Sequence, residues 1–241
     1  MSNAENKEVL SKLYPFLHDR KQDPELMNKA LLESVRQKVA SHQEVIAQFC
    51  AQHAQAIVST AGAIAQVYRT GGRLYTMGNG GSSCDAAHVA VEFLHPVTAG
   101  RPALTAVDLT ADRTMLTAVA NDVGYAHVFV RQIIAQGRAG DGLIGLSTSG
   151  GSENLVKAFR KAKEMGLVTI GLTGMSGGEM ATMGLDHCLV VGSGSIHRIQ
   201  ECHVLIYHML WDLVHTLLAD DRGNLSIGKA EALAASESEL K

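Results

Sequence analysis

The first long pattern in the chain is helical. From Pro24 to about Arg69, apolar residues return every three or four positions, with no proline after Pro24 and no glycine before Gly62. This spacing is typical of amphipathic helices rather than strands. The sequence therefore predicts an N-terminal helical extension over residues 1–70, formed by one broken helix or by two successive helices.

After residue 70 the pattern changes to short apolar runs that alternate with helix-like stretches. The runs typical of strands are Arg73–Met77, Leu104–Leu109, Gly142–Leu146, Val168–Leu172 and Cys188–Val191. The stretches typical of helices are Ser83–Leu94, Ala111–Val119, Ala126–Gln136, Glu153–Met165 and His197–Leu218. Such alternation predicts an α/β domain over residues 71–218, a doubly wound five-stranded parallel sheet flanked by helices, with ligands beyond the carboxyl ends of the strands.

Composition narrows the class of protein. The 241 residues are 46% hydrophobic, which suits one globular domain plus a helical extension. A net charge of −3 gives no long-range field that would favour nucleic acid or an anionic membrane, and no apolar run approaches the roughly 20 residues of a membrane span.

The cysteines and the two ends of the chain lead to further expectations. Four cysteines lie far apart, and no apolar secretory segment is present, so we expect reduced thiols and a cytoplasmic protein. The opening Met1-Ser2-Asn3-Ala4 is typical of an expression-vector remnant, and the Ala/Ser/Glu-rich residues 219–241 are expected to form a mobile tail.

Three predicted strand ends carry turns rich in glycine and hydroxyl side chains. Such turns can bind phosphate, because glycine lets the backbone approach closely and free N–H groups lie at the start of the next helix. The same residues also make ordinary turns and helix caps, but a cap needs only one hydroxyl, so the serine-rich second turn favours a phosphate site. The turns are Met77–Ser83, Leu146–Ser152 and Leu172–Gly178. The third has fewer hydroxyls and is expected to be an ordinary turn.

Two pairs of polar residues stand out on predicted helices. His88 and Glu92 are four residues apart and project from one face. Gln200 and His208 are eight residues apart, about 80° around an ideal helix, on a stretch that is otherwise apolar. His88 and Glu92 could share one metal ion, but a His/Glu pair at this spacing is also common on helix surfaces, and glutamine is an uncommon zinc ligand.

Five motifs together give the region from about residue 71 to residue 218 a specific likeness. The order and approximate spacing of these motifs resemble those of the phosphoheptose isomerases of the sugar isomerase (SIS) family. This resemblance implies a single SIS domain. The motifs are Gly78-Asn79-Gly80-Gly81-Ser82, Cys84-Asp85-Ala86-Ala87-His88 with Glu92, Asn121-Asp122, Ser147-Thr148-Ser149-Gly150 with Ser152, and Arg198-Ile199-Gln200-Glu201 with His208.

The resemblance implies an activity, a cofactor and a set of site residues. The implied activity is aldose-ketose isomerisation of sedoheptulose 7-phosphate to D-glycero-D-manno-heptose 7-phosphate, in lipopolysaccharide heptose biosynthesis. The implied cofactor is one zinc ion per subunit, held by His88, Glu92, Gln200 and His208, with Glu92 and His208 as the catalytic pair. The implied substrate contacts are Asn79, Gly80, Gly81, Ser82, Glu92, Asn121, Asp122, Ser147, Thr148, Ser149, Ser152 and Gln200.

The chemistry of an aldose-ketose shift agrees with that catalytic pair. A proton moves between adjacent carbons through an enediol, which requires a base, an acid and positive charge over the developing oxyanion. Glu92 is the candidate base and His208 the candidate acid. A carboxylate bound tightly to zinc becomes a poorer base, so the step that each residue serves stays open.

The helix geometry raises a question about oligomerisation. Eight residues of ideal helix place Gln200 and His208 about 12 Å apart along the axis, more than one zinc shell spans. Either the helix starts late, so that Gln200 leans in from its first turn, or the ligand pairs come from different subunits. The second possibility agrees with the resemblance, which implies a homotetramer with active sites between subunits.

One departure from the family and two rival functions remain. Family members often carry a Gly-Arg pair soon after the helix glutamate, whereas this chain reads Phe93-Leu94-His95-Pro96, and Arg101 is the candidate replacement. This departure puts the identity of the sugar in doubt. The rivals are a non-catalytic SIS module that binds a protein partner, similar to the DnaA initiator-associating protein, and a sugar-phosphate sensor.

Overall fold

The computed structural model describes residues 24–219 of the chain. The predicted vector remnant and the predicted tail beyond residue 219 lie outside the described residues. By its internal contacts the chain divides into two compact units, residues 1–41 and residues 42–241.

Helix α2 corrects one expectation from the sequence. It runs from Pro24 to Arg69 as one continuous helix of 46 residues, where a broken helix or two helices were predicted. Residues 25–69 contain no proline, and a lone glycine such as Gly62 costs a helix only about 1 kcal/mol, too little to interrupt it. In the first unit, residues 24–41 are helical and their apolar side chains, including Leu31 and Val35, are largely exposed.

The second unit is built on a five-stranded parallel sheet, as the alternating pattern predicts. Its strand order is β2-β1-β3-β4-β5, and each neighbouring pair is parallel. The strands are β1 (Leu74–Gly78), β2 (Ala106–Asp108), β3 (Gly142–Ser147), β4 (Val168–Gly174) and β5 (His187–Val191).

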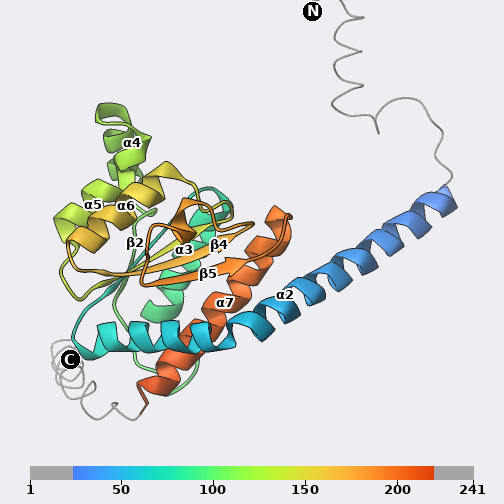
Figure 1. Ribbon diagram of the computed structural model, residues 1–241, viewed down its shortest axis with the longest axis horizontal. Helices are drawn as coiled ribbons and strands as arrows, with labels where there is room; N and C mark the ends of the chain where they lie inside the picture. The colour runs from blue at the N-terminus through green and yellow to red at the C-terminus, as the bar shows by residue number, and fades with distance from the viewer. Residues whose placement is uncertain (1–23, 220–241) are drawn as a thin grey trace, which may run out of the picture. The chain divides into compact units, whose positions relative to one another are not determined.

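Helices cover both faces of this sheet, which makes the fold doubly wound (Figure 1). Helix α7 and helix α3 lie on one face with the second half of α2, and the others lie on the opposite face. No described helix combines the length and the apolar character needed to cross a membrane. The helices that follow α2 are α3 (Gly81–Leu94), α4 (Arg113–Asp122), α5 (Val128–Gln136), α6 (Glu153–Glu164) and α7 (Ile196–Leu217).

The two faces of the sheet have separate cores, because successive residues of a strand point to opposite sides. In β1, Leu74 packs with α3 and α7, whereas the next residue, Tyr75, packs with the helices of the other face. In β3, Leu143 and Ile144 divide in the same way. Strands buried on both faces explain why the sequence shows continuous apolar runs rather than alternation.

Several element ends differ from the prediction for local reasons. Strand β2 is only three residues long, against the six predicted over Leu104–Leu109. Helix α4 begins at Arg113 rather than Ala111, because the Asp112 carboxylate accepts a hydrogen bond from the Met115 amide and caps the helix. Helix α5 begins after a 3₁₀ turn, Tyr125–His127.

The sheet topology fixes where a ligand can bind. The chain leaves β1 toward α3 on one face and leaves β3 toward α6 on the other, although β1 and β3 are neighbours. In doubly wound folds, ligands bind in the crevice that opens at this switch point, beyond the carboxyl ends of the strands. The first two predicted phosphate turns follow β1 and β3, so both lie at the switch point.

Two glycine substitutions should change stability in opposite directions. A Cβ atom on Gly78 would lie 2.2 Å from the Ser82 carbonyl oxygen, so Gly78→Ala should lower the free energy of unfolding by about 2 kcal/mol or more. A Cβ atom on Gly62 in α2 would meet nothing within 4 Å, so Gly62→Ala should raise it by about 1 kcal/mol. Urea unfolding at one fixed protein concentration measures the free energy of unfolding of both variants. If Gly78→Ala left it unchanged, the close contact with the Ser82 carbonyl would be contradicted.

A buried histidine should make stability depend on pH. His203 in α7 has no exposed surface, its Nε2 donates to the Thr173 carbonyl at 3.2 Å, and burial lowers its pKa from 6.5 to about 4. Between these pH values the unfolded chain binds a proton that the folded chain does not. The folded protein is therefore most stable with respect to His203 above pH 6.5. Its free energy of unfolding falls as the pH drops from 6.5 toward 4, by about 1.4 kcal/mol per pH unit at most.

The test compares the native chain with His203→Gln, which lacks the titrating group. Urea unfolding at pH 7, 6 and 5 should give a smaller loss of unfolding free energy between pH 7 and 5 in the variant than in the native chain. Equal losses in the two proteins would show that His203 does not titrate as its burial requires.

Candidate active site

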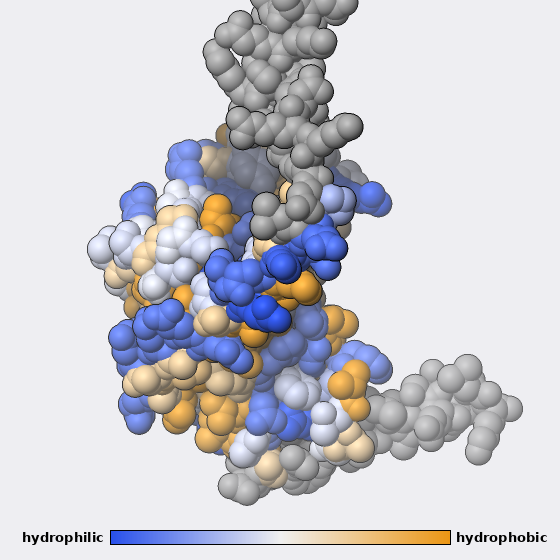
Figure 2. Space-filling model, turned by 90° about the vertical axis from the view of Figure 1, so that its right-hand side faces the viewer, coloured by the Kyte–Doolittle hydropathy of each residue, from blue (hydrophilic) through white to orange (hydrophobic). Residues whose placement is uncertain are grey.

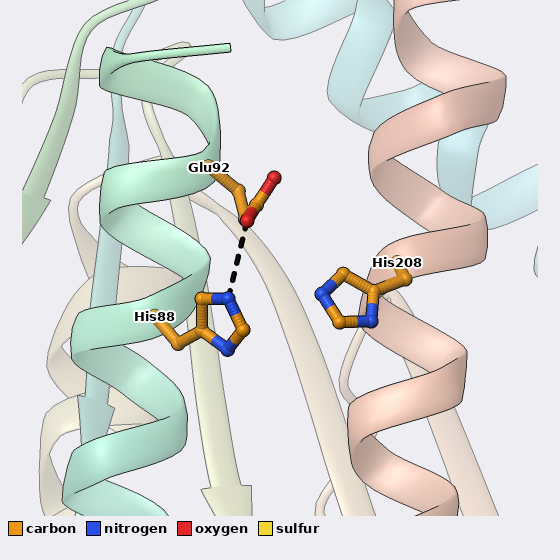
Figure 3. Close-up of side chains that lie close together, drawn as sticks. All are labelled: His88, Glu92 and His208. Carbon is orange, nitrogen blue, oxygen red and sulfur yellow. Dashed lines mark hydrogen bonds and ion pairs between the residues drawn. The ribbon is translucent and has the colours of Figure 1, made fainter. Parts of the chain in front are cut away.

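Three predicted site residues converge between α3 and α7. His88 and Glu92 project from α3, and His208 points toward them from α7 (Figure 3). One donor atom from each lies within 4.8 Å of the others, and His88 Nε2 lies 3.1 Å from Glu92 Oε1. All three are partly exposed, so a carboxylate and two imidazoles face one accessible space within a single chain.

The second ring nitrogen of His88 is held by Tyr207. His88 Nδ1 lies 2.7 Å from the Tyr207 hydroxyl, and the two rings meet edge to face. Tyr207 is only 2% exposed, and burial raises the pKa of its hydroxyl, helped by the negative charges of Asp85 and Glu92. A neutral hydroxyl thus fixes the His88 ring and leaves Nε2 directed at Glu92 and His208.

Gln200, the predicted fourth metal ligand, is hydrogen-bonded to a residue of α3. Helix α7 already begins at Ile196, so Gln200 lies inside the helix and does not lean in from a late start. Its Nε2 donates to Asp85 Oδ2 at 3.0 Å, about one turn of α3 before His88. Burial raises the pKa of Asp85, while the Gln200 hydrogen bond opposes that shift. The role of Gln200 as a zinc ligand therefore stays a prediction.

The first predicted phosphate turn forms the start of α3. Gly80 has φ 55°, in the left-handed region that favours glycine, and α3 begins without a side-chain cap. A Cβ atom on Gly81 would lie 2.7 Å from Gln200 Nε2, so a larger residue there would displace the Gln200 side chain. The Ser82 and Ser83 amides donate to the Asn79 and Gly80 carbonyls, which leaves the Gly80 and Gly81 amides at the start of the helix. Free N–H groups in this position attract anions.

The second predicted phosphate turn gathers three serine hydroxyls at the start of α6. Ser147 Oγ lies 3.5 Å from Ser149 Oγ and 3.3 Å from Ser152 Oγ. Ser147 Oγ also accepts a hydrogen bond from the Gly150 amide, and the half-buried Thr148 belongs to the same turn. Ser152 is the N-cap residue of α6, yet its side chain makes no capping hydrogen bond. These hydroxyls thus lie beside the positive end of a helix dipole.

A pair of asparagines joins the two turns. Asn79 and Asn154 exchange two amide hydrogen bonds, each 2.9 Å long, across the switch point. The Tyr125 hydroxyl donates to Asn79 Oδ1 at 2.8 Å, from the 3₁₀ turn before α5. Asn154 is 3% exposed, so it acts as a buried support that fixes the amide of Asn79.

Two predicted substrate contacts lie apart from this network. Asn121 and Asp122 end helix α4, where both are exposed, and Asn121 Nδ2 donates to Asp122 Oδ1 at 2.9 Å. Apart from this bond between the two, neither side chain has a hydrogen bond to another predicted substrate contact among the described residues. Their part in binding stays a prediction.

A comparison with protein families agrees with this geometry. The SIS domain family matches residues 39–174, more than half of the chain. The chain belongs to the SIS domain family. The match begins within α2 and ends with β4, so it includes both glycine-rich and serine-rich turns at the switch point.

Curated relatives of the chain are phosphoheptose isomerases. The one from Aneurinibacillus thermoaerophilus is 46% identical over 149 residues, which is 62% of this chain and 75% of the relative. The one from Aquifex aeolicus is 38% identical over 190 residues, 79% of this chain and 99% of the relative. Likeness over almost the whole length of such a relative makes this chain an enzyme of the sugar-phosphate isomerase class.

Solved structures give the same result. A phosphoheptose isomerase from Neisseria gonorrhoeae superposes with a TM-score of 0.73 at 37% identity and covers 77% of this chain and 99% of that one. One from Francisella tularensis gives a TM-score of 0.74 at 34% identity and covers 77% and 98%. The SIS fold expected from the motifs is thereby confirmed.

The sequence analysis of this SIS enzyme missed several residues that support the site. Tyr207 precedes the motif residue His208, and Asp85 lies within the motif that ends at His88. Their hydrogen-bond partners, His88 and Gln200, lie on the facing helix. Asn154 carries a weak signal, since it is a polar residue at a position of α6 that faces the core. Only the helix packing reveals which polar side chains meet.

Proposed function

We propose that this SIS enzyme converts sedoheptulose 7-phosphate to D-glycero-D-manno-heptose 7-phosphate in the cytoplasm, as a step of lipopolysaccharide heptose biosynthesis. The observation that carries the proposal is the meeting of Glu92 and His208, from helices far apart in sequence, beside a helix that starts in a phosphate-type turn. Relatives 38% to 46% identical are phosphoheptose isomerases, which supports the same substrate.

The two turns at the switch point are proposed to hold the phosphate of the substrate. Support comes from the hydroxyls of Ser147, Ser149 and Ser152, which lie close together at the start of α6. Backbone amides at the start of α3 and the Asn79 amide add donors from the other side of the crevice. Hydrogen-bond donors and helix dipoles bind an anion without net positive charge, which suits a chain of charge −3.

The residues present fit a zinc ion. Two imidazoles and one carboxylate are the donor set of many catalytic zinc sites, which keep a fourth position for water or substrate. Donor atoms of a tetrahedral zinc lie about 3.4 Å apart, so donors within 4.8 Å of one another need only a modest contraction. We therefore assign His88, Glu92 and His208 as ligands, with Gln200 as the predicted fourth ligand and substrate contact. A bound zinc ion would supply positive charge over the sugar oxygens.

The proton transfers are assigned to the chain's own residues. The Glu92 carboxylate takes a proton from carbon 1 of the ketose, which gives the enediol, and returns it to carbon 2. His208 moves a proton between the oxygens on these two carbons. Glu92 is only 19% exposed in its side chain, so water competes little for its carboxylate.

We also propose that the enzyme works as a homotetramer with active sites between subunits. Exposed apolar side chains support self-association, because Val91 and Leu94 lie three residues apart on one face of α3, and Val97 follows them. Figure 2 shows further apolar residues interleaved with polar ones on one face of the molecule. A tetramer is the geometry in which another subunit could contribute to the crevice.

The catalytic role of Glu92 can be tested by a change that removes its charge at constant volume. Glu92→Gln should lower turnover of sedoheptulose 7-phosphate by 100-fold or more, since general base catalysis contributes about 10²- to 10⁴-fold. Circular dichroism and the unfolding midpoint should stay close to those of the native enzyme. Turnover is measured as formation of the aldose phosphate.

A matched control is Glu164→Gln, which neutralises an exposed carboxylate at the end of α6. Its turnover should equal that of the native enzyme. Full activity of Glu92→Gln would refute the assignment. An inactive native chain that binds the sugar phosphate would instead favour a sensor or a non-catalytic partner-binding module.

The hydroxyl of Tyr207 should contribute to zinc binding. Groups that orient metal-bound histidines typically change metal affinity by about 10- to 100-fold when they are removed. Tyr207→Phe removes the contact with His88 Nδ1 and should weaken zinc binding by about 10-fold or more, measured by competition with a chelator. Tyr68→Phe, which removes a 3.3 Å hydrogen bond to the Thr105 carbonyl in the same core, should leave zinc affinity unchanged. Equal affinity in both variants would contradict this role.

A further inference from the structure

The single tryptophan of the chain lies beside the candidate active site. Trp211 is on α7, three residues after His208, and its indole N–H donates to the Glu92 main-chain carbonyl at 2.8 Å. The side chain of Glu92 is the proposed base, so this hydrogen bond holds the backbone of the residue on which the chemistry depends. It links α7 to α3 across 119 positions of sequence.

The Glu92 carbonyl needs such a partner because of the sequence that follows it. Carbonyls in the last turn of a helix lack the amide that would continue the hydrogen-bond ladder. For Glu92 the residue four positions on is Pro96, which has no N–H to donate. The neighbouring carbonyls have backbone partners, since Val91 accepts from the His95 amide and Phe93 from the Leu104 amide. The indole supplies the donor that the proline lacks.

The indole ring is itself fixed in place. The Arg101 guanidinium carbon lies 4.2 Å from the centre of the Trp211 ring, and Arg101 Nη2 pairs with Asp212, the next residue of α7. A cation over an indole face is an attractive contact, and the ion pair orients it. Arg101, the candidate replacement for the family's Gly-Arg pair, makes both of these contacts with α7, and its part in phosphate binding stays a prediction.

We propose that Trp211 is a positioning residue for Glu92. Its indole N–H fixes the last turn of α3 against α7, so that the Glu92 carboxylate stays directed at His88 and His208. The inference rests on the proposed function, because it assigns Trp211 an effect on the zinc and proton-transfer site. Trp211 hydrogen-bonds to the main chain of Glu92 and takes no part in proton transfer.

The experiment removes the N–H group and keeps the ring. Because the chain has one tryptophan, growth of a tryptophan auxotroph on β-(3-benzothienyl)alanine replaces the N–H of Trp211 alone with sulfur. We expect zinc binding, measured by chelator competition, to weaken by 10-fold or more and kcat to fall by at least as much, with little change in KM. Trp211→Phe, made by mutation, should behave in the same way. Replacement by 5-fluorotryptophan, which keeps the N–H, should restore native values.

A matched control separates positioning from general loss of stability. Tyr75→Phe removes another 2.8 Å hydrogen bond from a side chain to a helix-end carbonyl, that of Gln136, on the opposite face of the sheet. It should lower the unfolding midpoint about as much as the benzothienyl replacement does, since each removes one hydrogen bond, yet leave zinc affinity and kcat unchanged. If Tyr75→Phe weakens zinc binding equally, the effect of Trp211 is only structural and the inference is wrong.

The native protein provides a check that needs no turnover. Its fluorescence comes from a single indole next to the ligand cluster, so added zinc should change the emission, and a chelator should reverse the change. If the native enzyme and its benzothienyl form bind zinc equally well, the positioning role of Trp211 is wrong but the proposed function stands. A native chain that neither binds zinc nor isomerises the sugar contradicts the proposed function itself.

Discussion

Helices α3 and α7 run side by side in a register that brings their polar residues together. Seven residues separate Asp85 from Glu92 on α3, a rise of about 10 Å, and eight separate Gln200 from His208 on α7, about 12 Å. Because these two rises are nearly equal, two contacts form along the helix pair. Gln200 bonds to Asp85 at one level, and His208 lies beside His88 and Glu92 at the next. A shift of one residue would turn α7 by about 100° and separate these contacts, so the site depends on this packing.

In this helix pair, apolar contacts drive the association and polar contacts select the register. Ala86, Val89 and Phe93 of α3 share one core with Ile199 and Ile206 of α7, and their burial drives the association. Burial of this kind is not directional and does not choose a register by itself. The hydrogen bonds of Tyr207 and Trp211 do, because a buried polar group without its partner costs about 1–3 kcal/mol.

Features of this structure can be predicted from the sequence when the residues that form them are close together in the chain. Strands and helices arise from patterns within about 20 residues, and all five strands and the helices between them could be located in advance. The His88 and Glu92 spacing was likewise visible, because one helical turn determines it. Motif order and resemblance then indicated that Gln200 and His208 belong to the same site.

What could not be predicted depends on contacts between distant segments. The hydrogen bonds of Tyr207 to His88 and of Trp211 to Glu92 each join residues 119 positions apart, and only the register of two packed helices determines them. Arg101 shows the same limit, since its charge was evident but its stacking on Trp211 was not. The continuous α2 was missed because no local signal distinguishes a tolerated glycine from a helix break.

Under the proposed function, helix α3 also sets the distance between the two ends of the substrate. It starts at Gly81, inside the first phosphate turn, and His88 and Glu92 follow about 10 and 16 Å along its axis. Side chains on a helix tilt toward its N-terminus, which shortens these distances somewhat. A sugar phosphate must therefore be long enough to keep its phosphate at the start of α3 while its carbonyl carbon reaches Glu92. A short phosphorylated triose cannot satisfy both contacts at once, whereas an extended chain with phosphate and carbonyl at opposite ends can, so the length of α3 itself selects for long sugar phosphates under the proposed function.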